Sequence, residues 1–305
     1  MYTIQTATNQ FLSSLSSLEN RLNRDSAQVS SGLRVQTVSD APDSISEILS
    51  VNAQIAGNNQ IKTNLQSVQT EVNVAENAIN TVSTLMDRAS QIAANGANNS
   101  SNIDRSQLAS EVQSILEEVQ QLANTQVSGH YVFSGSSDQT APYGGVNFTA
   151  NPTNGVGAYQ GSNLTKTALD PYGAQFSIAL TAQQVFDGGS SGTPATSIFQ
   201  SLTALYNALS SDDLTGTANA VTNITNVVGY LNQQQAAYGD FQNRISDAIN
   251  DQGVLATNLK TQLGNLQDAD MAQAITNQQM DSTALTAAEG AYSGIPRKSL
   301  FDFLG

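Results

Sequence analysis

The stretch IKTNLQSVQTEVNVAENAINTVSTLMDRA, residues 61–89, decides the fold. Its apolar residues recur at alternating steps of four and three positions, which is the spacing of a heptad repeat. On a helix this spacing places them on one side, where they form a seam that another helix must cover. The seam consists of Ile61, Leu65, Val68, Val72, Ala75, Ile79, Val82, Met86 and Ala89. We therefore predict a long helix from about residue 43 to residue 94.

Further seams of this kind lie on both sides of the middle of the chain. A polar turn at 95–102 precedes a predicted helix over 104–126, and two seamed helices joined in this way should fold back as an antiparallel pair. Helical spacing returns over 198–266. We interpret these seams as an ordinary bundle core, formed by residues 43–127 together with 198–267.

The segment 128–197 has a different pattern, with glycine-rich turns and short runs of β-prone residues. The strand candidates are residues 131–133, Phe148, Tyr159 and residues 176–180. About 70 residues can bury only a small core, so this module should lean on the helices. The sequence thus predicts a mainly α protein, a long antiparallel helical rod with a small inserted β-rich outer domain.

The two ends of the chain carry seams but lie outside the predicted bundle. They form a predicted terminal domain, residues 1–42 with 268–305, and inside one chain they can pack only against each other. Because a lone helix pair is marginally stable, we expect these ends to be disordered before assembly and ordered once other copies cover them. The candidate subunit-packing residues are Ile4, Phe11, Leu15, Leu18, Leu22, Val29, Leu259, Leu263, Leu266, Met271, Ile275, Leu285, Leu300, Phe301, Phe303 and Leu304.

Local signals predict where the terminal helices begin and end. Gly32 should end the first helix, and Asp40 should lie near the N-cap of the next. Asp268 or Asp270 should cap the last helix, which Gly294 and Pro296 should kink or stop.

Composition limits the function classes. The chain has 305 residues, 12% of them charged, and a formal net charge of −14. This charge argues against a nucleic-acid or anionic-membrane partner. No apolar run of about 18 residues and no cleavable secretion signal is visible, so a location in the cytosol or export without cleavage is expected.

Little in the sequence points to catalysis. The chain has no cysteine and a single histidine, His130, so it lacks the usual zinc or copper ligand set. It contains no H-E-x-x-H and no P-loop motif. The adjacent carboxylates Glu117 and Glu118 point about 100° apart on a helix and do not converge. We expect no enzyme, cofactor or metal, although an enzyme in the β-rich module and a signalling coiled coil are alternatives.

Both helical arms resemble the bacterial flagellin family. The resemblance is carried by Ser30-Ser31-Gly32-Leu33-Arg34 with residues 39–42, by residues 85–96 and, near the other end, by residues 265–272. It implies flagellin-like terminal and core helical layers in a non-enzymatic subunit of the extracellular bacterial flagellum. It also implies export through the flagellar type III apparatus, an export chaperone, and partners that are copies of the chain and neighbouring flagellar proteins.

Two shorter stretches indicate a position within this family. Residues 129–135 and 299–304 resemble family members that form the junction between hook and filament. The resemblance implies assembly as a homo-oligomeric ring or helical layer through the terminal coiled-coil segments. A short filament flagellin is the alternative.

Overall fold

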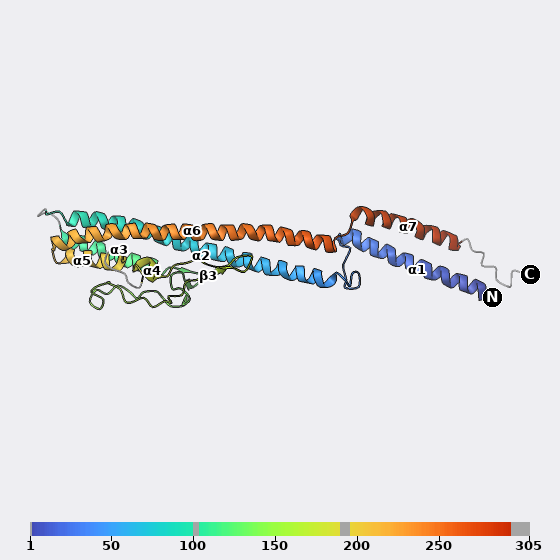
Figure 1. Ribbon diagram of the computed structural model, residues 1–305, viewed down its shortest axis with the longest axis horizontal. Helices are drawn as coiled ribbons and strands as arrows, with labels where there is room; N and C mark the ends of the chain where they lie inside the picture. Colours follow the sequence, from blue (N-terminus) through green and yellow to red (C-terminus); the bar gives the residue numbers. More distant parts are fainter. Residues whose placement is uncertain (1, 100–103, 190–195, 294–305) are drawn as a thin grey trace, which may run out of the picture. The chain divides into compact units, whose positions relative to one another are not determined.

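The computed structural model describes residues 2–99, 104–189 and 196–293 (Figure 1). Over this part of the chain it has seven helices and two two-stranded antiparallel sheets, which confirms the mainly α prediction. The helices are α1 (Tyr2–Ser31), α2 (Ile45–Gly96), α3 (Arg105–Ala123), α4 (Ala182–Phe186), α5 (Ile198–Ser210), α6 (Leu214–Gln267) and α7 (Met271–Ser293). The strands are β1 (Gln126–Val127), β2 (His130–Tyr131), β3 (Thr167–Leu169) and β4 (Gln175–Ser177).

The chain divides into two compact units. Met1–Gly57 and Ala256–Gly305 form the first, and Asn58–Leu255 forms the second. The long helices α2 and α6 contribute residues to both units.

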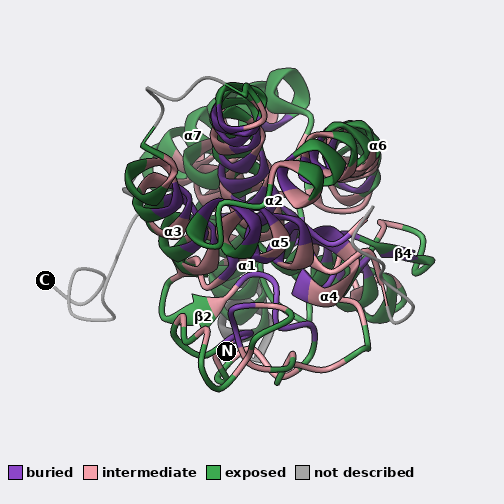
Figure 2. Cartoon of the chain, turned by 90° about the vertical axis from the view of Figure 1, so that its left-hand side faces the viewer, coloured by how far each residue is buried: buried purple, intermediate pink, exposed green. Residues whose placement is uncertain are grey.

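The second unit is a helical bundle with a continuous apolar core. Buried residues gather where α2, α3 and α5 meet (Figure 2). The seam predicted for α2 lies in this core, with Ile61 and Val68 partly buried against it. Side chains of α2 and α6 also meet, since Gln235 Nε2 donates to Asn80 Oδ1 at 2.9 Å. The predicted packing of this seam is therefore confirmed.

The inserted segment between α3 and α5 is built mostly from loops. The strand predictions for Phe148 and Tyr159 are wrong, because both lie in turns or irregular structure. Their rings serve packing instead of strand pairing. Phe148 stacks on Tyr206 of α5 with ring centroids 4.0 Å apart, and the Tyr159 hydroxyl donates to the Phe133 carbonyl at 3.2 Å. The predicted runs at 131–133 and 176–180 overlap β2 and β4 only in part.

Aromatic side chains join this segment to the bundle. Phe133 meets Phe186 edge-on, with ring centroids 5.3 Å apart, and Tyr238 of α6 at 6.5 Å. The buried hydroxyl of Tyr143 donates to Asp187 Oδ2 at 2.6 Å, and burial raises the pKa of Asp187. The segment thus shares the core of the helices, as expected for a module too small to stand alone.

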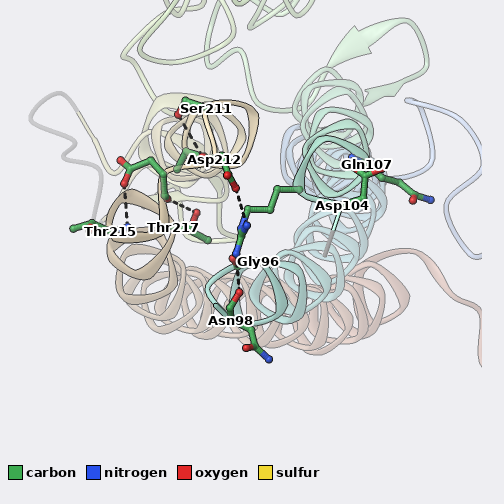
Figure 3. Close-up of polar contacts among 11 residues, drawn as sticks. Gly96, Asn98, Asp104, Gln107, Ser211, Asp212, Thr215 and Thr217 are labelled. Carbon is green, nitrogen blue, oxygen red and sulfur yellow. Dashed lines mark hydrogen bonds and ion pairs between the residues drawn. The ribbon is translucent and has the colours of Figure 1, made fainter. Parts of the chain in front are cut away.

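Arg105 links the α2–α3 turn to the α5–α6 turn. Its partners Gly96, Asn98 and Asp212 are shown in Figure 3. Its Nε donates to the Gly96 carbonyl at 2.9 Å and its Nη2 to the Asn98 carbonyl at 2.7 Å. Its Nη1 lies 2.7 Å from Asp212 Oδ1. The Arg105 side chain is only 11% exposed, so its bonds to the two carbonyls are shielded from solvent.

Arg105→Ala is expected to lower the free energy of unfolding by about 1–3 kcal/mol, because it leaves two carbonyls at the end of α2 without their donor. The ion pair with Asp212 adds little, since that carboxylate is largely exposed. Thermal unfolding followed by circular dichroism measures the change. The matched control is Arg88→Ala, which removes the exposed Arg88–Glu111 pair and should change stability by less than about 0.5 kcal/mol. Equal losses in the two variants would contradict the expectation.

Two of the three helix-end predictions that fall on described residues are confirmed. Gly32, with φ +74°, follows the last residue of α1. Asp270 Oδ1 accepts from the Gln273 N–H at 3.1 Å and caps α7. The prediction for Asp40 is wrong, because its Oδ2 accepts from the N–H groups of Thr37 and Gln36, which precede it. Both hydrogen bonds lower the pKa of Asp40, and the bond from the Thr37 N–H has the larger effect.

Candidate subunit-packing surface

In the first unit α1 and α7 form an antiparallel pair. The Phe11 ring stacks on the Tyr292 ring, with centroids 5.4 Å apart and planes 7° from parallel. Further along, Arg21 Nε lies 3.2 Å from Asp281 Oδ2. The pair is therefore held by an aromatic stack near one end and an ion pair near its middle.

The seam predicted on α1 faces α7. Leu18 is only 7% exposed, and the register set by the Phe11 and Arg21 contacts places it level with Leu285 of α7. The other seam residues of α1 that the structure describes are partly buried; they are Phe11, Leu15, Leu22 and Val29. Within one chain, α7 thus covers much of the α1 seam.

On α7 the residues that face α1 differ in part from those that the sequence pattern indicated. Ala274 is buried and Leu285 is partly buried, whereas Met271 and Ile275 are exposed, Ile275 by 40%. Met280 is exposed as well. The apolar side chains of α7 therefore point to several sides, which is the pattern of a helix with more than one helical neighbour.

The candidate residues on α6 lie beside the start of α2. Leu259 is buried, and Leu263 and Leu266 are partly buried. At the same level, Gln262 Nε2 donates to Glu47 Oε1 of α2 at 3.3 Å. These leucines are thus largely covered within the chain.

A backbone clasp joins the connector after α1 to the junction between α6 and α7. The Gln267 carbonyl accepts from the N–H groups of Arg34 and Val35, at 2.7 and 3.2 Å, and the Gly32 carbonyl accepts from the Ala269 N–H at 2.9 Å. The Arg34 guanidinium also donates to the Leu266 carbonyl at 2.7 Å. The last carbonyls of α6 are therefore satisfied by the connector.

Sequence reasoning missed this clasp. Residues 30–34 and 265–272 were singled out for their resemblance to a family, but heptad spacing gives no sign that they meet. The available signal was a glycine and an arginine just after one helix, together with an acidic break between two others.

A polar groove separates part of α1 from α7. Its volume is about 630 Å³, and Ser26 Oγ accepts from Gln278 Nε2 inside it at 3.0 Å. The lining residues are Leu22, Ser26, Gln278, Gln279, Ser282 and Thr283. The contact between the two helices is therefore interrupted by hydroxyl and amide groups.

Several candidates lie outside the described residues. The side chain of Ile4 is not described, and neither are Leu300, Phe301, Phe303, Leu304 and the predicted break at Gly294 and Pro296. His130, the single histidine of the chain, is about half exposed, and its Nδ1 lies 2.9 Å from Asp138 Oδ2.

The described residues contain no group of three or more His, Asp or Glu residues placed to hold a metal ion. Among them, no helix combines the length and the apolar character that crossing a membrane requires.

Terminal helices that cover each other on one side and keep apolar side chains exposed on others are typical of a class of protein, the helical subunits that pack against further helices. Family comparison identifies the family. The bacterial flagellin N-terminal helical region matches residues 3–138, and the bacterial flagellin C-terminal helical region matches residues 221–304. The two regions span most of the chain, and the chain belongs to the bacterial flagellin family.

Relatives of two kinds are similar to this chain. Flagellar hook-associated protein 3 of Salmonella typhimurium is 25% identical over 301 residues, covering 90% of each chain. The flagellar filament 33 kDa core protein of Treponema phagedenis is 24% identical over 247 residues, covering 81% of this chain and 78% of the relative.

Solved structures share the fold. Flagellar hook-associated protein 3 of Legionella pneumophila superposes with a TM-score of 0.61 at 16% identity, over 72% of this chain and 98% of that one. FlgL of Xanthomonas campestris superposes with a TM-score of 0.54 at 18% identity, over 69% of this chain and 99% of that one.

Proposed function

We propose that this chain is the structural subunit of the hook–filament junction of the bacterial flagellum. Membership of the flagellin family makes it a structural component of the flagellum. The single observation that carries the assembly mechanism is the α1–α7 pair, in which the apolar residues Met271, Ile275 and Met280 stay exposed after the two helices have covered each other.

The junction position is supported by the extent of similarity. The relative named hook-associated protein 3 aligns over 90% of both chains, whereas the relative named as a filament core protein aligns over 81% of this chain and 78% of its own. The stretch 129–135, which carries the junction-type resemblance, also has a specific local structure. It begins at Gly129, with φ +84°, and ends at Gly135, where a Cβ would lie 2.3 Å from the Ser162 carbonyl oxygen.

Assembly then follows from packing. Copies of the chain cover the exposed sides of α7 with their own terminal helices, in head-to-tail contacts that close a ring or a helical layer. The neighbours on either side are hook and filament proteins. Export proceeds through the flagellar type III apparatus without a cleaved signal, with a chaperone on the exposed termini. Disorder of these termini before assembly stays a prediction.

Immunogold labelling of isolated flagella tests the position. A single labelled band at the hook end of the filament is expected, because a junction subunit forms one layer. Labelling along the whole filament would contradict this proposal and indicate a short filament flagellin. That is the second candidate, because filament core proteins are also among the relatives. A strain that lacks the gene is the control, and it should lose the band together with stable filament attachment.

A further inference from the structure

Two amide side chains interrupt the apolar contact between α2 and α6 near one end of the second unit. Asn58 of α2 is 6% exposed and Gln252 of α6 is 1% exposed, so both are buried. On α2, Asn58 follows Ile55 and precedes Ile61, which are partly buried apolar residues. Asn58 is therefore a polar residue in an otherwise apolar seam.

The hydrogen bonds of these amides are incomplete. Asn58 Nδ2 donates to the backbone carbonyl of Gln252 at 3.3 Å. Asn58 Oδ1, Gln252 Oε1 and Gln252 Nε2 are buried and have no partner among the described residues. A buried polar atom without a partner loses the hydrogen bonds it had with water, so these three atoms destabilise the closed contact.

Glycines lie beside both amides. Gly57 precedes Asn58 and is the only glycine of α2 before its last residue, and Gly253 follows Gln252. A Cβ at either glycine would meet no heavy atom within 4 Å, so close packing does not require glycine there. Since α6 has other glycines, Gly57 is the more specific feature of this layer. A glycine inside a helix lowers helix stability relative to alanine.

We propose that the Asn58–Gln252 layer is a built-in opening point of the α2–α6 pair. The two helices separate at this level before the rest of the unit unfolds, and the amides gain hydrogen bonds to water in the opened state. Both features act in the same direction, since the unpaired amides destabilise the closed contact and Gly57 weakens the helix that carries one of them. The result is local deformability in a long helix pair, at the expense of stability. This inference does not rest on the flagellar role of the chain.

Hydrogen exchange of the purified full-length chain tests the proposal. In the unmodified protein, amides of residues 55–60 and 250–255 should exchange at least about tenfold faster than those of residues 72–79 in the same bundle. Replacing both amides by leucine (N58L/Q252L) should slow exchange at this level by about tenfold and raise the melting temperature by about 3–6 °C. Exchange as slow as in residues 72–79, or a lower melting temperature of the leucine variant, would overturn the proposal.

Two further variants keep the test decisive if the leucine variant folds poorly. Gly57→Ala adds a methyl group into open space and should slow exchange over residues 55–60 several-fold. The matched control N59L/N258L replaces exposed amides on the same helices and should leave exchange over 55–60 and 250–255 unchanged. Slower exchange in the control variant would contradict a specific role of the buried layer. Unchanged exchange over residues 55–60 in Gly57→Ala would contradict it as well.

Discussion

Leu18→Asp is expected to abolish incorporation of the protein into flagella while the unit Asn58–Leu255 stays folded. Leu18 is almost fully covered by α7, level with Leu285. A carboxylate there loses its hydration in the apolar contact, and the substitution should destabilise the α1–α7 pair by about 3 kcal/mol or more. Since α1 and α7 together present the outer apolar residues, loss of the pair removes the surface that we propose to contact neighbouring copies.

Complementation of a deletion strain measures this effect through motility and filament attachment. Thermal unfolding of the purified variant should keep the main transition of the bundle. The control is Ser16→Asp, which places the same charge on an exposed position of α1 two residues away and should support normal attachment. Normal attachment with Leu18→Asp would contradict the role given to the terminal pair.

Phe133→Ala is expected to give the largest loss of stability in the second unit. Phe133 is completely buried and contacts both Phe186 and Tyr238, so its removal leaves a cavity between the inserted segment and α6. Such substitutions lower the free energy of unfolding by about 3–5 kcal/mol. The melting temperature should fall by about 6–20 °C in a unit of this size.

The control for Phe133→Ala is Tyr172→Ala in the β3–β4 turn. Tyr172 is 72% exposed, and its removal should change stability by less than about 0.5 kcal/mol. A Phe133→Ala variant that melts like the control would mean that the inserted segment is not part of the bundle core. Calorimetry and urea titration together measure the change, because the urea midpoint should move while its slope stays constant.

The sequence predicts well where periodicity and local chemistry act alone. The seam of α2 is buried as expected, because a step of three or four residues fixes which side of a helix is apolar. Gly32 and Asp270 act at helix ends through their own backbone geometry or side chain, so they too can be recognised from sequence.

Tertiary contacts decide which face of a helix is buried and which residue a side chain contacts. Periodicity and local chemistry do not predict these outcomes. On α7, Ala274 is buried and Ile275 is 40% exposed, although isoleucine is the more apolar residue, so burial on this helix does not follow apolar character alone. Phe148 pairs its ring with Tyr206 instead of entering a strand. Arg105 reaches acceptors on two separate turns, and no spacing rule connects them.

The backbone clasp around Gln267 has a consequence for how such a chain can diverge. It ties the connector after α1 directly to the junction between α6 and α7, through carbonyl and amide groups that every amino acid except proline can supply. Everything between Val35 and Leu266 is thereby enclosed in a loop whose two ends are already joined. Replacement or enlargement of the inserted segment should consequently leave the distance between the end of α1 and the start of α7 unchanged.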